Sequence, residues 1–294
     1  MPKTKDKPKK KNKKKHKNKM VEQTTLADRA DRYALYGLSV QEPANEAEFF
    51  NNTYKQLNGK EPRILREDFC GTHAVCCEWV KLHKKNVAYG VDLDPEPLAW
   101  GKANLQPALT DEQRSRINLY EDDVRSTAEV KADVLAAQNF SFFLFKTRDA
   151  LRGYFAQALA NIADDGIMVM DMMGGSDCHI ENHEDVRTID TDVKGFKKFK
   201  YIWEQNRFNP ITADALFHIH FRFKDGSELD KAFTYDWRFW TLPEVTELLL
   251  EAGFSDATVY WEETDEDGDE TGEFSPASEG PADPSWIAYI VAQK

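Results

Sequence analysis

Strand and helix patterns alternate over residues 61–175, and this alternation limits the possible fold more than any other feature. Short apolar runs of strand length occur at 63–66, 87–93, 117–120, 134–137 and 167–172. Helical patterns lie between most of them, at 74–84, 96–104 and 147–163. The last run is almost wholly apolar, as expected for a parallel strand covered on both faces. This order predicts an α/β fold with a doubly wound, mostly parallel sheet.

The second half of the chain has a different pattern. Residues 200–237 alternate with a period of two around a polar turn at 224–227, which predicts an antiparallel β-hairpin inserted over 200–240. A helix is expected at 242–252, and strands at 257–262 and 286–292. No helix separates these two strands, so they must pair antiparallel. We therefore expect seven strands with a reversed strand at the C-terminal edge, and an acidic flexible loop at 262–285.

The N-terminal end is strongly basic and the rest of the chain is acidic. Residues 1–20 hold eleven lysines and one aspartate, whereas the other 274 residues carry a net charge of −22. Residues 1–22 are expected to form a disordered tail, and 23–60 a helical N-terminal segment. An acidic domain is a poor general partner for nucleic acid, so nucleic acid is expected to bind only through the tail. The tail could equally touch an anionic membrane or the acidic loop.

Several broad classes of protein are not expected from this composition. No apolar run approaches the ~20 residues of a membrane-spanning helix, and no hydrophobic segment follows the lysines as in a signal peptide. The four cysteines form no CxxC pair, which argues against a disulfide scaffold or zinc ribbon. We therefore expect a cytoplasmic protein, or a nuclear one in a eukaryotic host. The sequence leaves open whether it is a monomer or a homodimer.

Acidic side chains follow three of the expected strands in turn. Glu67 precedes a turn that contains Gly71, and Asp92 ends the next strand, 21 residues after Gly71. Such a turn can present backbone N–H groups to a ligand, and a carboxylate placed like Asp92 can accept both hydroxyls of a ribose. Asp122 and Asp123 after the third strand could accept from an adenine amino group. Carboxylates repel phosphate, so the pattern favours a nucleoside without phosphates.

The motifs that contain these residues resemble those of class I S-adenosylmethionine-dependent methyltransferases. They are REDFCGTH at 66–73, then GVDLDPEPL, EDDVR and QNFSF in that order. The resemblance extends over about residues 28–294. It implies a Rossmann-like methyltransferase domain over 23–294, with its cofactor-binding half at 61–175 and the segment 23–60 as a cover. S-adenosylmethionine would be the cofactor and S-adenosylhomocysteine the product.

The loop after the first strand departs from the family's pattern. The family has an acid, one spacer and three glycines at alternate positions; here Glu67 is the acid and Gly71 the middle glycine. Phe69 and His73 replace the outer glycines, which let the backbone approach a ligand closely. The resemblance implies a reshaped loop that still binds the cofactor, or one that has lost it. The residues it assigns to the cofactor are Tyr33, Tyr36, Glu67, Phe69, Gly71, Thr72, Asp92, Leu93, Asp122, Asp123, Val124 and Asn139.

The acceptor side of the expected site is less specific. The activated methyl group requires alignment and exclusion of water more than a base, and the candidates for a catalytic role are Asn139, His73 and Tyr235. The candidates for substrate contact are Ser141, Trp203, Tyr235, Trp237 and Arg238, of which the last could clamp a carboxylate. The Pro-Pro-Tyr/Phe signature of amino-methylating nucleic-acid enzymes is absent. Histidine clusters at 179–183 and 218–220 lack a recognised third-ligand spacing, so no metal is expected.

These observations lead to three hypotheses about function. The first is methyl transfer from S-adenosylmethionine to an O or N atom of a small-molecule acceptor. The second is an RNA or protein methyltransferase that the lysine-rich tail tethers to its substrate. The third is a non-catalytic binding or scaffold protein with the same fold.

Overall fold

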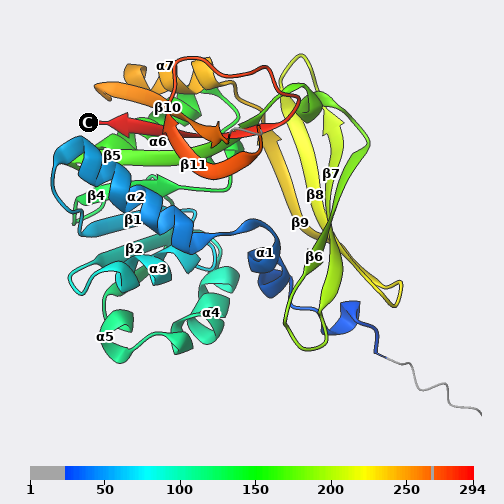
Figure 1. Ribbon diagram of the computed structural model, residues 1–294. Coiled ribbons are helices and arrows are strands. Elements are labelled where there is room, and N and C mark those ends of the chain that lie inside the picture. The colour runs from blue at the N-terminus through cyan, green and yellow to red at the C-terminus, as the bar shows by residue number, and fades with distance from the viewer. Residues whose placement is uncertain (1–23, 266–267) are drawn as a thin grey trace, which may run out of the picture.

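An eight-stranded, mostly parallel sheet forms the main body of the computed structural model, which describes residues 24–265 and 268–294 (Figure 1). The strand order is β11-β10-β12-β5-β4-β1-β2-β3. The strands are β1 (Ile64–Asp68), β2 (Val87–Asp92), β3 (Ile117–Glu121), β4 (Ala132–Ala137), β5 (Ile162–Gly174), β10 (Asp256–Thr264), β11 (Glu270–Pro276) and β12 (Trp286–Gln293). Strands β1 to β5 are parallel, and β12 runs antiparallel to both β5 and β10. The doubly wound sheet with a reversed strand is confirmed. The predicted tail at 1–22 lies outside the described residues.

The prediction of a flexible loop over 262–285 is wrong for residues 270–276. These residues form β11, which pairs antiparallel with β10 and makes the sheet eight-stranded instead of seven-stranded. Phe274 anchors this strand, because its ring packs edge-on against Tyr289 with the ring centroids 4.8 Å apart. Most of the other β11 residues are exposed. One partly buried aromatic residue thus holds an acidic edge strand that composition alone cannot reveal.

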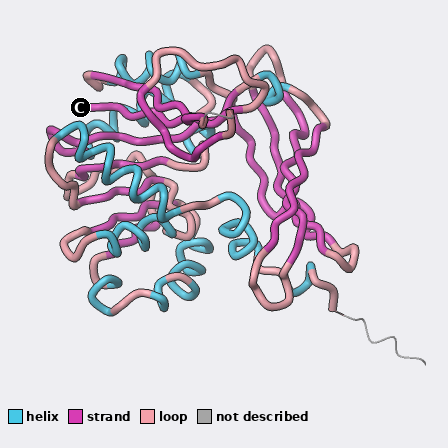
Figure 2. The backbone as a smooth tube through the Cα atoms, viewed as in Figure 1, coloured by secondary structure: helices cyan, strands magenta, loops and turns pink. Residues whose placement is uncertain are grey.

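A separate antiparallel sheet stands beside the main sheet (Figures 1 and 2). It contains β6 (His183–Asp190), β7 (Lys198–Phe208), β8 (Asp214–Phe223) and β9 (Glu228–Arg238), paired in chain order. The predicted hairpin corresponds to β8 and β9, but it is part of a four-stranded sheet. Strand β6 escaped prediction because it is an edge strand with almost every residue exposed, so its sequence carries no period-two pattern of apolar residues.

Helices cover both faces of the main sheet. They are α1 (Arg32–Val40), α2 (Pro43–Asn58), α3 (Ala74–Leu82), α4 (Pro95–Asn104), α5 (Asp111–Arg114), α6 (Arg148–Asn161) and α7 (Leu242–Ala252), with short 3-10 helices at Ala27–Arg29, Gln106–Ala108, Ser141–Leu144 and Ser176–His179. The predicted helical segment at 23–60 is divided at Pro43, which suits only a first helical turn. Helix α1 packs with the second sheet through Leu35, and α2 packs with the main sheet through Phe50 and Tyr54.

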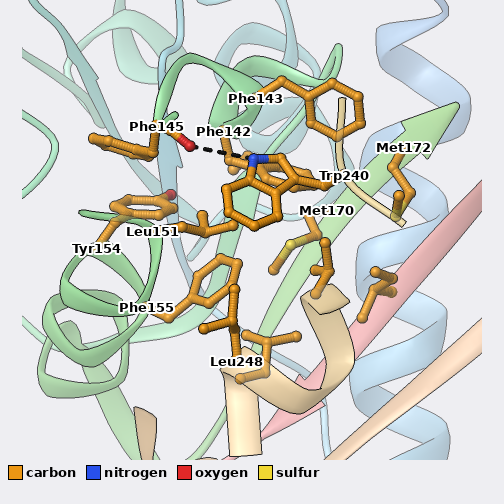
Figure 3. Close-up of a cluster of buried hydrophobic side chains, with 14 of the residues drawn as sticks. Phe142, Phe143, Phe145, Leu151, Tyr154, Phe155, Met170, Met172, Trp240 and Leu248 are labelled. Carbon is orange, nitrogen blue, oxygen red and sulfur yellow. Dashed lines mark hydrogen bonds between the residues drawn. The ribbon is translucent and has the colours of Figure 1, made fainter. Parts of the chain in front are cut away.

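The largest core cluster joins α6 and α7 to the main sheet and holds the loop after β4 (Figure 3). Phe142 and Phe143 in that loop are fully buried, with their rings edge-on at 5.0 Å. Trp240, just after β9, is also fully buried and donates from Nε1 to the Phe145 carbonyl at 3.2 Å. These contacts link the second sheet to the loop after β4, and so fix the position of Asn139 and Ser141.

In the part of the chain that the structure describes, no helix is both long and apolar enough to cross a membrane.

Candidate active site

A cavity of about 520 Å³ lies between the carboxyl edge of the main sheet and strand β9. Its walls come from α1, the turn after β1, the end of β2, the loop after β4, and β9. Ten residues predicted from the sequence line it: Tyr33, Tyr36, Glu67, Phe69, Gly71, Thr72, Asp92, Asn139, Ser141 and Tyr235. They come from segments more than 200 residues apart, so the fold brings together side chains that the sequence placed only by motif.

Asp92 is fixed at the end of β2 by backbone hydrogen bonds. Its Oδ2 accepts from the Gly71 N–H at 2.7 Å, and its Oδ1 accepts from the Asp94 N–H at 2.9 Å. Burial raises the pKa of this carboxyl group, while the two N–H donors act in the opposite direction. The carboxylate therefore links the turn after β1 to the end of β2, in the wall of the cavity.

The turn after β1 has a left-handed backbone at all three positions where the family would have glycine. The φ angles are 57° at Phe69, 50° at Gly71 and 52° at His73. The Phe69 ring packs with Tyr154 at 5.6 Å between centroids, which offsets part of the cost of this conformation. A Cβ atom added at Gly71 would meet nothing within 4 Å, so the turn is open there. Two bulky residues thus form a reshaped loop without closing the cavity.

His73 points away from the cavity, which argues against the catalytic role considered for it. It is fully buried against Gly101 of α4, and its Nε2 lies 3.3 Å from the Gln106 side-chain amide. Burial lowers its pKa to about 4, so the imidazole is neutral near pH 7. Its place at the start of α3 in a left-handed conformation is that of a packing residue.

Successive residues of β1 point to opposite faces of the sheet, and Arg66 and Asp68 share one face. Asp68 accepts from Arg66 Nε at 2.7 Å and from the Tyr154 hydroxyl at 3.0 Å. Arg66 also donates to the Val124 carbonyl at 2.8 Å. Burial raises the pKa of Asp68 to about 6, against the opposing effect of Arg66. Arg66 and Asp68 thereby connect β1 to the segment after β3.

Glu67 points to the other face, where the carboxyl groups have no basic partner. Its Oε2 accepts from the Cys76 N–H at 3.0 Å, and burial raises its pKa to about 7. Asp171 of β5 accepts from the Phe140 N–H at 3.1 Å, and burial raises its pKa to about 7. Burial and the charges of Asp171 and Glu67 raise the pKa of Glu46, on α2, to about 8.

Three polar residues near the site were not predicted from the sequence: Glu46, Asp171 and the cavity residue Gln138. Asp171 is the one acidic residue in the apolar run 167–172, and Gln138 directly follows the apolar strand β4. Both positions carry a signal, since a polar residue in or after a buried strand needs a partner. The sequence around Glu46 gives no such signal, because an acid in the first turns of a helix is ordinarily solvent-exposed.

The aromatic residues expected to cover the cofactor line the second-sheet side of the cavity. The Tyr36 and Tyr235 hydroxyls lie near each other, and burial raises the pKa of both. The Tyr36 ring packs against Phe233 at 5.0 Å, and the Tyr33 ring against Trp100 at 5.6 Å. The Tyr36 and Tyr235 hydroxyls therefore stay protonated at neutral pH, where they can donate a hydrogen bond but cannot act as a base.

Four other residues assigned to the cofactor, Leu93, Asp122, Asp123 and Val124, do not line this cavity. Leu93 is 71% exposed, and Asp123 is held by the Arg125 guanidinium, which lowers its pKa to about 2. Asp122 lines a second cavity of about 420 Å³ beside Tyr120, and the Val124 carbonyl accepts from Arg66. The Asp122 N–H donates to the Asp92 carbonyl at 3.1 Å, so these residues adjoin the site at its edge.

Three of the expected substrate contacts also lie outside the cavity. Trp203 stacks on Phe217 at 4.9 Å, and Trp237 stacks on Tyr235 at 4.4 Å behind the wall. The Arg238 guanidinium donates to Glu244 at 3.1 Å and lies 3.8 Å from the Trp240 ring centroid. The Arg238 guanidinium therefore binds a residue of α7 and not the cavity, so the predicted carboxylate clamp is not supported.

Within the described ranges, one group of side chains has the spacing of metal ligands. It consists of His220, Glu228 and Asp230 on β8 and β9. Both ring nitrogens of His220 already have carboxylate neighbours, Asp230 at 2.7 Å and Glu204 at 2.9 Å. The geometry is that of a histidine shared between acids and requires no metal.

Comparison with known proteins gives structural but no sequence relatives. No family model matches the chain, and no curated protein does. The amino pentose methyltransferase CalS10 from Micromonospora echinaspora, solved with bound S-adenosylmethionine, is 15% identical with a TM-score of 0.63, over 89% of this chain and 95% of that one. Streptomyces venezuelae DesVI is 15% identical with a TM-score of 0.64, over 90% and 98%. An S-adenosylmethionine-dependent methyltransferase from Clostridium acetobutylicum is 14% identical with a TM-score of 0.64, over 89% and 96%. These likenesses show that the chain has the fold of S-adenosylmethionine-dependent methyltransferases.

Proposed function

We propose that this protein transfers a methyl group from S-adenosylmethionine to a small-molecule acceptor. The observation that carries the proposal is the Asp92 carboxylate, held by the Gly71 N–H in the wall of a cavity at the carboxyl edge of the sheet. The structural neighbours support it, because CalS10 is described as bound to S-adenosylmethionine and the glycopeptide N-methyltransferase MtfA as complexed with S-adenosylhomocysteine.

The residues of the cavity suit this cofactor in charge and in shape. S-adenosylmethionine brings a ribose and two cationic groups, and the wall offers the carboxylates of Asp92 and Glu67. The turn leaves open space at Gly71, where a backbone can approach a ligand closely. Asp92 would accept the ribose hydroxyls, Glu67 would face the methionine part, and Tyr33 and Tyr36 would cover it. Leu93, Asp122, Asp123 and Val124 would contact the adenine from the adjoining edge, and Phe69, Thr72 and Asn139 the remainder.

The cofactor supplies an activated methyl group, and the chain supplies alignment and a dry site. Partly buried aromatic residues on β9 and α1 exclude water from one side, and the buried loop after β4 does so from another. Asn139, Ser141 and Tyr235 line the cavity and are proposed to orient the acceptor. A cavity of about 520 Å³ suits a small acceptor better than RNA or protein.

Titration calorimetry with S-adenosylmethionine and S-adenosylhomocysteine tests the proposal. We expect the wild type to bind both, and Asp92→Ala to bind each about 10- to 100-fold more weakly, because a charge-assisted hydrogen bond to the ribose is lost. Asp149→Ala, which removes an exposed acid from α6, is the control and should bind like the wild type. Absence of binding by a folded wild type would contradict the proposal and leave a non-catalytic protein of this fold.

A further inference from the structure

Strand β9 borders the cavity along the edge that does not pair with β8. It is an edge strand of the second sheet, and residues 231–235 of this strand all line the cavity. Successive side chains of a strand point to opposite faces of its sheet, so a cavity lined by five consecutive residues meets the strand at its edge. The backbone of β9 is therefore part of the cavity wall.

The register with β8 shows which backbone groups of β9 point to this edge. The Phe239 N–H donates to the Ala213 carbonyl at 2.8 Å, in the register that holds without a shift over 233–238. In an antiparallel pair, residues that bond to the partner strand alternate with residues whose N–H and C=O point away from it. Odd-numbered residues from 233 to 239 therefore bond to β8, and Thr234 directs both its N–H and its C=O away from β8.

Protein contacts occupy this edge on either side of Thr234. The Ala232 carbonyl accepts from Arg32 Nη1 of α1 at 3.4 Å. In the other direction Asp236 lies outside the cavity, where its carboxylate accepts from Lys146 Nζ at 2.5 Å. Within residues 24–265 and 268–294, no protein group bonds to the Thr234 N–H or carbonyl. Thr234 therefore presents a donor and an acceptor to the cavity side by side.

We propose that the methyl acceptor is a short peptide or a similar amino-acid derivative, and that one of its residues pairs with Thr234 as a residue of an added strand would. The proposal rests on the proposed function and specifies its substrate class. The Thr234 N–H donates to the carbonyl of that residue, and the Thr234 carbonyl accepts its N–H. A peptide suits this edge because the N–H and C=O of one extended residue lie on the same side of its backbone.

The surroundings of this edge suit an added peptide strand. The cavity lies between β9 and the carboxyl edge of the main sheet, so an acceptor bound on β9 faces the cofactor. Groups that flank the paired residue lie on the face of β9 to which Phe233 and Tyr235 point. Both residues line the cavity, and the Phe233 ring packs against Tyr36 at 5.0 Å. The backbone thus recognises the amide groups, and aromatic rings contact what lies beside them.

The test uses the full-length protein saturated with S-adenosylhomocysteine and two probes that differ in one N–H. N-acetylphenylalanine methylamide has the N–H that would pair with the Thr234 carbonyl, and its N-methylphenylalanine analogue lacks it. We expect ligand-observed NMR to show at least about fivefold tighter binding of the first probe. Thr234→Pro removes the outward N–H and keeps the hydrogen bonds to β8, and should weaken the first probe at least about fivefold. Asp236→Pro makes the same change at the next outward position, outside the cavity, and is the control.

A second measurement covers the case in which Thr234→Pro fails to fold. In wild-type protein with isotopically labelled threonine, the Thr234 N–H resonance should shift when the first probe is added. Thr234→Ala keeps the backbone, so its affinity for the first probe should stay within about twofold of the wild type. Equal binding of the two probes by the wild type, or a Thr234 resonance that does not shift, would overturn the proposal. Failure of the wild type to bind S-adenosylhomocysteine would instead refute the proposed methyltransferase function.

Discussion

The two faces of strand β1 hold buried acids in opposite ways. On one face Asp68 has Arg66 at 2.7 Å and the Tyr154 hydroxyl at 3.0 Å, so its charge is neutralised inside the protein. On the other face Glu67 receives one backbone N–H and shares its surroundings with two further acids. The two residues are adjacent in the sequence and equally deep in the fold.

The difference separates acids that hold the structure from acids available to a ligand. A buried ion pair is strongly destabilising to break from one side, because the remaining charge is left uncompensated. A carboxyl group without a basic partner makes no ion pair inside the protein, so a cation that enters the site can form its first one. The face that holds the Arg66–Asp68 ion pair, here called the paired face, thus connects β1 to the segment after β3. The face that holds Glu67, here called the unpaired face, lies towards the cavity.

Breaking the paired face should give the largest effect on stability. Arg66→Met leaves Asp68 without its cation and the Val124 carbonyl without its donor. We expect the free energy of unfolding to fall by about 3–5 kcal/mol in urea denaturation. Arg148→Met removes an exposed ion pair with Glu251 and should cost less than about 1 kcal/mol. Similar losses in the two variants would refute the structural role of Arg66.

The unpaired face should respond in the opposite direction and with pH. The folded-state pKa of Glu46 is about 8, above its unfolded value, so the folded protein binds the extra proton. Stability of the wild type therefore falls as pH rises from about 4.5 towards 8. Glu46→Gln removes this loss, and we expect it to be more stable than the wild type by about 2–3 kcal/mol at pH 9 and nearly equal at pH 5. Thermal unfolding at the two pH values measures this. A stability difference between Glu46→Gln and the wild type that is the same at both pH values would contradict it.

A substitution at Gly101, which packs against the turn after β1, should have a moderate effect on stability and on cofactor binding. An alanine at Gly101 would place Cβ about 2.2 Å from the Thr72 carbonyl oxygen, so the turn would have to move. We expect Gly101→Ala to lose about 1–2 kcal/mol of stability and several-fold in affinity for S-adenosylhomocysteine. Gly153→Ala in α6 meets nothing within 4 Å and should gain up to about 1 kcal/mol. A neutral Gly101→Ala would show that the turn tolerates displacement.

Removal of residues 1–23 should give the smallest effect. The described residues that line the cavity lie between Arg32 and Tyr235, so we expect the affinity of the truncated protein for S-adenosylhomocysteine to change by less than about twofold. The same measurement at 50 and 200 mM salt should show no difference between the full-length and the truncated protein. A large, salt-dependent loss of activity on RNA after the truncation would instead favour a tethered RNA enzyme.

The sequence predicted the parallel sheet and the wall of the cavity well, because both depend on local patterns. Apolar runs of strand length predicted β1 to β5, and residues of the motifs around Gly71 and Asp92 line one cavity, while their cofactor roles stay predictions. Arg238 and Trp237 were misplaced, since an aromatic or basic residue on a strand can serve either a cavity or a core, and only the tertiary contacts decide. Glu46 could not be found, because its burial depends on a helix packing over strand ends far along the chain.

The structure of the protein with bound S-adenosylhomocysteine tests the central claim most directly. We predict the ribose hydroxyls on the Asp92 carboxylate and the homocysteine part towards Glu67, in the cavity between the main sheet and β9. A ribose that contacts no atom of Asp92, or a ligand bound in the second cavity beside Tyr120, would contradict the proposed site.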